Sequence, residues 1–299
     1  MKTLLTVIAL AGASLAGVAQ AQVTTLKKVQ DSGEIVMGVR ESSSPLSFTL
    51  GNNQYAGYHV DLCRAIVEQI SKTIGKPVNI KYTPVTSQNR IPLVQNGTVD
   101  LECGSTTNNA ARQKDVAFGL TTYVTEVRTA VKAKSGITSI GQLGNKTVAT
   151  TTGTTSVQTL RKHQRAEKIT FKDLFGKDHA DSFLLLETGR ADAFVMDDNI
   201  LAGLIANAKE PKDFKIVGEV LSVEPIAVMI RRDDPGMKRL VDLTIRTMMS
   251  SGELAKLYAK WFTSPIPPKN ANVNLPMGAT LKGLFANPKD NPMESYAVK

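Results

Sequence analysis

Apolar and polar residues follow patterns along this chain that predict strands and helices in alternation. Glu34 to Val39 is an almost continuous apolar run, which is typical of a strand covered on both faces of a sheet. Val60 to Ile74 repeats apolar residues at helical spacing, and Gly75 and Pro77 end that helix. Val78 to Val85 then alternates as a second strand. Strands and helices that alternate in this way predict an α/β fold.

The same criteria predict the remaining elements. These are a helix over 26–33, a hairpin over 48–58, a helix with Asn89 as its cap, strands over 123–132, 146–150, 193–196, 215–220 and 226–230, and helices from about 156–163, 178–190, 238–250 and 252–262. The tail from Ser264 holds six prolines and is expected to be extended.

One pattern occurs twice. Leucine, glycine and aspartate follow the spacing L-x-x-x-G-x-x-D over 93–100 and again over 185–192, about 92 residues later. This spacing is too long for a solenoid and suits two similar α/β lobes. Each copy leads to a polar loop at the carboxyl end of a strand, where open α/β sheets bind ligands.

The order of these elements predicts two crossings between the lobes. The run 123–132 is the first crossing and 222–225 is the return. The first lobe would comprise residues 22–124 and 224–299, and the second lobe residues 125–223. Two crossings side by side form a natural hinge.

The first 21 residues have the features of a cleavable signal peptide. A lysine precedes a short apolar stretch, and Ala19-Gln-Ala21 fits the small-x-small cleavage rule. No later stretch approaches the roughly 20 apolar residues of a membrane span. No cysteine lies near the cleavage point, so we expect no lipid anchor. The mature chain is therefore expected to be exported and soluble.

Composition narrows the classes of partner. The net charge is +9, the basic residues are spread along the chain, and aromatic residues make up 5%. This favours anionic partners in general and argues against nucleic acid. Two cysteines and three scattered histidines lack the spacing of a metal site. Cys63 and Cys103 are either joined in a disulfide or are two small buried residues, and the sequence leaves both alternatives open.

The stretch from Glu102 to Arg112 carries the clearest candidate chemistry. It follows a predicted strand, breaks at Gly104, and offers the hydroxyl groups of residues 105–107 before the arginine. Hydroxyl and amide donors beside a planar guanidinium can hold a small carboxylate. A hydroxyl-rich loop taken alone is more commonly a turn or a helix cap.

Two further arginines occupy positions that suit an anion. Arg40 follows the first strand at its carboxyl end, and Arg90 would lie beside a helix N-terminus, whose dipole also favours negative charge. Asn89 is the expected cap because Pro92 fits only in the first helical turn. Solvated surface arginines remain the alternative at both positions.

Seven motifs in order give the chain a resemblance to the polar amino-acid-binding proteins that feed bacterial ABC importers, in particular to the branch that binds acidic amino acids. The motifs are residues 39–43, 86–92, 102–108 with Arg112, 152–156, 177–179, 196–198 and 265–270. The resemblance covers residues 26–290. It implies a type II periplasmic-binding-protein fold with the ligand in the cleft between two hinged lobes.

The same resemblance implies a periplasmic, monomeric, non-catalytic protein without cofactor or metal. Its ligand would be L-glutamate or L-aspartate, and its partner an inner-membrane ABC permease. Arg112, with Ser105 and Thr107, would hold the α-carboxylate. Asp197 would take the α-ammonium, and Thr155 would contact the ligand from the second lobe.

Selectivity would lie at the other end of the ligand. The resemblance places Arg40 and Arg90, with Ser87 and His179, around the side-chain carboxylate. Three arginines against Asp197 leave an expected charge of +2, which suits a dicarboxylate. A neutral ligand would leave guanidinium groups unpaired, at about 2–5 kcal/mol for a buried charge.

Two alternatives stay open. The first is an enzyme on the same scaffold, for example a periplasmic dehydratase of cyclohexadienyl acids, with His179 and Glu102 as acid–base candidates. The second is a sensor component that reports acidic amino acids to a receptor.

Overall fold

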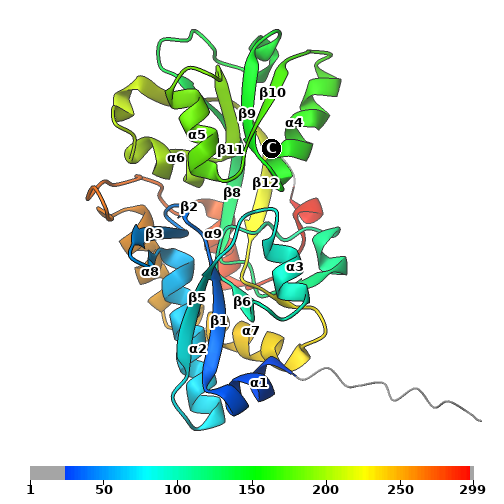
Figure 1. The fold of residues 1–299 in the computed structure, drawn as a ribbon, viewed down its shortest axis with the longest axis vertical. Helices are drawn as coiled ribbons and strands as arrows, with labels where there is room; N and C mark the ends of the chain where they lie inside the picture. Colours follow the sequence, from blue (N-terminus) through cyan, green and yellow to red (C-terminus); the bar gives the residue numbers. More distant parts are fainter. Residues whose placement is uncertain (1–23, 297–299) are drawn as a thin grey trace, which may run out of the picture.

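The computed structural model describes residues 24–296. Two lobes lie one above the other along the long axis of the molecule, and each is built around a five-stranded sheet (Figure 1). The predicted signal peptide, residues 1–21, lies outside the described residues. In the part of the chain that is described, no helix is long and apolar enough to cross a membrane.

The first lobe has a mixed sheet. Its strands are, in spatial order, β5 (Asn79–Pro84), β1 (Glu34–Val39), β6 (Leu101–Glu102), β13 (Met229–Arg231) and β7 (Val116–Phe118). β1 pairs in parallel with β5 and β6, whereas β13 is antiparallel to β6 and β7. A small antiparallel sheet adjoins it, formed by β2 (Ser42–Ser43), β3 (Ser47–Gly51) and β4 (Gln54–Ala56).

Helices bury the core of this lobe. They are α1 (Thr25–Ser32), α2 (Tyr58–Ile74), α3 (Arg90–Gln95), α7 (Pro235–Ser250), α8 (Glu253–Phe262) and α9 (Ala279–Ala286), with short 3₁₀ turns η1 (Arg112–Lys114) and η4 (Met293–Ser295). Leu62, Ile66 and Ile70 form the buried stripe of α2, as the sequence predicted. Cys63 in the same stripe forms a disulfide with Cys103, at the end of β6. The bond ties α2 to the start of the hydroxyl-rich loop.

The second lobe has a five-stranded sheet with helices packed on both of its faces. Its strands are, in spatial order, β10 (Lys172–Gly176), β9 (Thr147–Thr151), β11 (Ala193–Asp197), β8 (Tyr123–Lys132) and β12 (Phe214–Ile226). Its helices are α4 (Thr155–Ala166), α5 (His179–Glu187) and α6 (Asp198–Ala206), with 3₁₀ turns η2 (Ile140–Leu143) and η3 (Pro211–Asp213). Leu160 of α4 belongs to the apolar cluster on one face of the sheet, while Phe183 and Ile200 belong to the cluster on the other (Figure 1).

Two long strands run between the lobes. β8 and β12 pair in antiparallel register from Tyr123 with Ile226 to Lys132 with Phe214, and Figure 1 shows them passing from one lobe to the other. β12 is one strand with an irregularity between Val217 and Ser222, where the sequence predicted a strand followed by a separate crossing.

The C-terminal tail differs from its prediction. It was expected to be extended, but α9 forms within it because Leu281 and Leu284 can be buried on one side. Leu281 packs into the core of the first lobe. The prolines of the tail lie outside α9, so they do not interrupt it.

Candidate ligand-binding site

One cavity lies between the two lobes, where the loops after several strands meet. Seven of the nine predicted ligand-binding residues line it. They are Ser87, Arg90, Ser105, Thr107, Thr155, His179 and Asp197, and the cavity wall also includes Thr154 and Met196. Arg40 reaches this group through hydrogen bonds, whereas Arg112 borders a neighbouring hollow that shares Thr154 and Thr155 with it. The structure therefore gathers residues that are far apart in the chain, from Arg40 to Asp197.

Arg90 presents uncommitted donors in this cavity. The residue starts α3, and Asn89 occupies the cap position as predicted, although its side chain accepts from the Thr86 N–H (2.8 Å) rather than capping the helix. Arg90 is buried, and its Nε and Nη1 have no hydrogen-bond partner among the described residues. The buried Oγ of Ser87 also lacks one within the same residues. A buried group left without a partner is costly, so this corner is suited to an anion.

The charges around Arg90 also favour an anion beside its guanidinium. Burial lowers the pKa of its guanidinium, and the positive charges of Arg112 and Arg40 lower it further, against the opposing effect of Glu102 and Asp197. An anion placed against Arg90 would offset both the desolvation and the repulsion.

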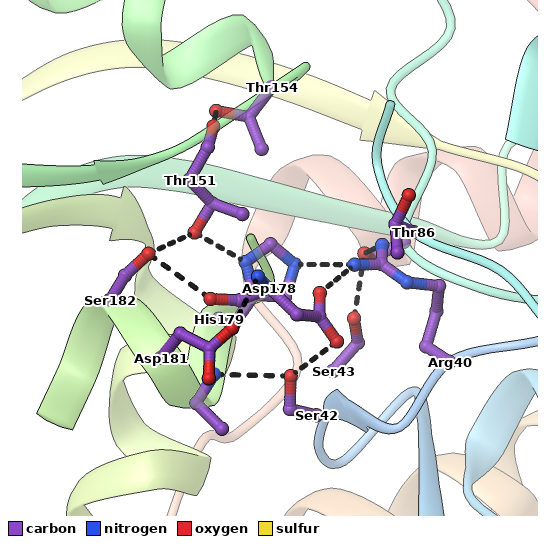
Figure 2. Close-up of polar contacts among 12 residues, drawn as sticks. Arg40, Ser42, Ser43, Thr86, Thr151, Thr154, Asp178, His179, Asp181 and Ser182 are labelled. Atoms are coloured by element: carbon purple, nitrogen blue, oxygen red, sulfur yellow. Dashed lines mark hydrogen bonds and ion pairs between the residues drawn. The ribbon is translucent and has the colours of Figure 1, made fainter. Parts of the chain in front are cut away.

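Arg40 is engaged across the cleft. Its side chain has no solvent exposure, and its Nη2 forms an ion pair with Asp178, the residue before α5 in the other lobe. Nη1 donates to Ser105 Oγ (3.3 Å). Asp178 also accepts from Ser42 Oγ (2.8 Å), so two residues of the first lobe hold it (Figure 2). The Arg40 guanidinium and these hydrogen bonds hold the pKa of Asp178 at about 2, although burial opposes them.

His179 lines the cavity and contacts both Arg40 and Thr151. Arg40 Nη2 lies 3.3 Å from its Nε2, and because an arginine can only donate, Nε2 must accept. Nδ1 then carries the hydrogen and donates to Thr151 Oγ1 (3.0 Å; Figure 2). Burial, with the neighbouring Arg40, lowers the pKa of His179 to about 3, so the ring is neutral near pH 7. Both ring nitrogens of His179 are thus engaged within the protein, and its contact with a ligand stays a prediction.

Arg112 closes the wall between the hydroxyl loop and the second lobe. Its Nη1 donates to the backbone oxygen of Thr107 (2.9 Å) and its Nη2 to that of Gly153 (3.4 Å). Gly153 has φ +82°, and a Cβ there would collide with the backbone of Gln88 at 2.8 Å. A glycine therefore allows the second lobe to approach the loop before α3.

Asp197 is the buried acid at the end of β11. Burial raises the pKa of its carboxyl well above the usual value, and the nearby carboxylates Glu224 and Asp198 raise it further. Arg90 and Arg112 counteract them only in part. A cation beside Asp197 would favour its ionised form, so this end of the cavity suits an ammonium group.

Three acidic residues lie at the site that were not predicted to bind the ligand, although Glu102 was an acid–base candidate of the enzyme alternative. Glu102, Asp178 and Glu224 are carboxylates beside the arginines, so four carboxyl groups, not one, face Arg40, Arg90 and Arg112. The expected charge of +2 is therefore wrong for the site as a whole. Any preference for acidic ligands must come from where the charges lie.

The sequence contained a weak signal for each of these three. Glu102 begins the hydroxyl-rich stretch, Asp178 lies in the motif 177–179, and Glu224 lies in the predicted return crossing. Spacing could place these residues near the cleft, but it could not tell where their side chains point. No cluster of His, Cys, Asp and Glu suited to a metal ion occurs within residues 24–296.

Comparison with known proteins gives this geometry a context. The family model for bacterial extracellular solute-binding proteins, family 3, matches residues 35–264. A glutamate/aspartate import solute-binding protein of Escherichia coli (strain K12) is 46% identical over 271 residues, which cover 90% of each chain. An L-glutamate/L-aspartate-binding protein of Pseudomonas aeruginosa is 44% identical over 273 residues, again 90% of each chain.

Solved structures agree on the fold. A mutant of ArgBP from T. maritima superposes with a TM-score of 0.71 at 25% identity, covering 80% of this chain and 99% of that one. The expected type II two-lobe architecture is thereby confirmed. The chain belongs to the bacterial extracellular solute-binding proteins, family 3.

Proposed function

We propose that the protein binds L-glutamate or L-aspartate between its lobes in the periplasm and delivers it to an inner-membrane ABC permease. The names of the relatives from E. coli and P. aeruginosa support the ligand class. The observation that carries the proposal within this chain is Arg90, whose buried Nε and Nη1 have no partner among residues 24–296. A side-chain carboxylate would supply the missing acceptors, and the neighbouring Ser87 hydroxyl would add a donor.

At the opposite end, the protein holds the α-carboxylate and the α-ammonium of the ligand, which all amino acids share. Arg112 presents its guanidinium beside the hydroxyl loop and receives the α-carboxylate. Asp197, buried among acids, receives the α-ammonium. Arg40 supports the side-chain end, with its Nε uncommitted among the described residues and its other nitrogens fixed by Asp178, Ser105 and His179.

Closure of the hinge on the ligand is the signal that the permease reads. Residues 22–124 and 224–299 form one lobe and residues 125–223 the other, so that β8 and β12 cross the hinge. The ligand bridges the two lobes because Arg90 belongs to one and Asp197 to the other. A permease would then recognise the closed, monomeric form.

Substitution of Arg90 tests the proposal. In Arg90→Gln, the affinity for glutamate should fall by about 30-fold or more, since losing the partner of a buried charge costs about 2–5 kcal/mol. The affinity for glutamine should fall much less. Arg161→Gln is the matched control, because Arg161 lies on α4 and pairs with Asp173 at the exposed surface. Equal losses for glutamate and glutamine, measured by calorimetric titration, would remove Arg90 from this role.

A further inference from the structure

A single buried oxygen atom joins the two lobes behind the cavity. Glu224 lies on β12, the return strand of the hinge, and is completely buried. Its Oε2 accepts from Thr107 Oγ1 at 2.6 Å and from Thr155 Oγ1 at 2.7 Å. Thr107 belongs to the hydroxyl loop of the first lobe, and Thr155 begins α4 in the second. Its other oxygen, Oε1, accepts from Ser222 Oγ at 2.8 Å.

These contacts fix the direction of both threonine hydroxyls. A hydroxyl group has one hydrogen to donate and two lone pairs. Thr107 and Thr155 each give that hydrogen to Glu224, so only lone pairs remain for any further partner. The two hydroxyl oxygens lie 3.4 Å apart and both residues line the cavity together with Asp197. Glu224 is not among the described residues that line it.

Acceptors alone suit a cation rather than a carboxylate. A primary ammonium has three hydrogens to donate, and Asp197, Thr107 and Thr155 offer three acceptors in the wall of the same cavity. A carboxylate brought to the same two hydroxyls would meet lone pairs, and it would have to displace Glu224 to gain a donor. The expectation that Thr107 holds the α-carboxylate therefore conflicts with the direction of its hydroxyl.

We infer that Glu224 is a positioning residue: it turns the hydroxyls of Thr107 and Thr155 into acceptors and so completes, with Asp197, a receptor for the α-ammonium group that draws on both lobes. This inference rests on the proposed function and deepens it, because it assigns the residues that distinguish an amino acid from a plain dicarboxylate. The carboxylate of Glu224 also lies near Asp197, whose pKa it raises, and near Arg112. The receptor is complete only when the lobes meet, since Thr107 and Thr155 come from different lobes.

The test compares glutamate with glutarate, which has the same two carboxylates but no ammonium. The readout is the ratio of their dissociation constants, measured by direct and displacement titration. Glu224→Met removes the acceptor for both hydroxyls and should lower the ratio at least tenfold. Glu224→Gln keeps an amide oxygen that can accept both hydrogens, so it should retain most of the ratio. Glu219→Met, at an exposed position of the same strand, is the control and should leave it unchanged.

Three results of these titrations would overturn the role given to Glu224. A loss of equal size for glutamate and glutarate in Glu224→Met would mean that Glu224 only supports the fold, and would overturn the inference. A ratio that falls as far in Glu224→Gln as in Glu224→Met would also overturn it, because charge rather than hydroxyl direction would then be responsible. If Glu224→Met does not fold, Thr107→Val and Thr155→Val must lower the same ratio, and an unchanged ratio contradicts the inference. Failure of the unaltered protein to bind glutamate would instead refute the proposed function.

Discussion

Arg40 and Asp178 form an ion pair that bridges the two lobes, between the end of β1 in one and the start of α5 in the other. Arg40 has no exposed side-chain surface, while that of Asp178 is 15% exposed. Ser42 strengthens the bridge, since its hydroxyl donates to Asp178 and accepts from the Ala180 N–H. These contacts exist only while the lobes are together, so they stabilise the closed form.

Neutralising Asp178 should therefore weaken closure. In Asp178→Asn, Arg40 would remain buried without its anion when the lobes meet, whereas open lobes would return it to water. Breaking a buried pair typically costs about 3–5 kcal/mol, and we expect at least a tenfold lower affinity for glutamate given the partial exposure of Asp178. Small-angle scattering should also show a larger radius for the ligand-free variant.

Asp173→Asn provides the control for that variant. Asp173 pairs with Arg161, which is 44% exposed, and such surface pairs contribute little. Its affinity and radius should match those of the unaltered protein. If Asp178→Asn binds glutamate as tightly as this control, the ion pair does not contribute to closure.

Glutamate binding should release protons at pH values between 3.8 and the raised pKa of Asp197. The pKa of Asp197 is raised by burial and by Glu224, so without a cation nearby it keeps its proton above the usual value of 3.8. The ligand ammonium favours the ionised form, so the proton must leave on binding. Affinity should thus increase as the pH rises from 3.8 towards the raised pKa. Calorimetry in two buffers of different ionisation enthalpy measures this release, and proton uptake would contradict the assignment.

The disulfide should contribute to stability more than to binding. Cys63 and Cys103 close a loop with a sequence separation of 40, for which loop entropy predicts a stabilisation of about 4 kcal/mol or less. For a protein of this size, about 1 kcal/mol corresponds to roughly 2–4 °C in melting temperature. The double variant Cys63→Ala/Cys103→Ala should melt several degrees lower and bind glutamate within about threefold. An unchanged melting temperature would show that the bond does not stabilise the folded protein.

The backbone elements could be predicted well where local chemistry determines them. β1 and β8 occupy the predicted ranges because an almost continuous apolar run defines β1 and a stretch rich in valine and threonine defines β8. Pro92 indicated Asn89 as the first residue before α3. α9 was missed because its leucines lie in a tail dominated by prolines, where the short apolar pattern gave little weight to a helix.

Seven of the nine predicted ligand-binding residues line one cavity, but the contacts among the site residues could not be predicted. Arg90, Thr107 and Asp197 were expected to meet, and they line one cavity. The partners of Arg40 and Thr107 could not be foreseen, because Asp178 and Glu224 lie more than 100 positions away in sequence and reach them only through tertiary packing. A hydroxyl also leaves its direction undecided in sequence, since serine and threonine can either donate or accept.

Calorimetric titration of the ligand-freed protein with glutamate, aspartate, glutamine and asparagine tests the central claim most directly. The placement of Arg90 and Ser87 predicts that both acids bind more tightly than either amide, because an amide nitrogen cannot accept from the uncommitted donors of Arg90. Glutamate and aspartate differ by one methylene and should differ by about 200-fold or less. Tighter binding of glutamine or asparagine than of either acid would contradict the account.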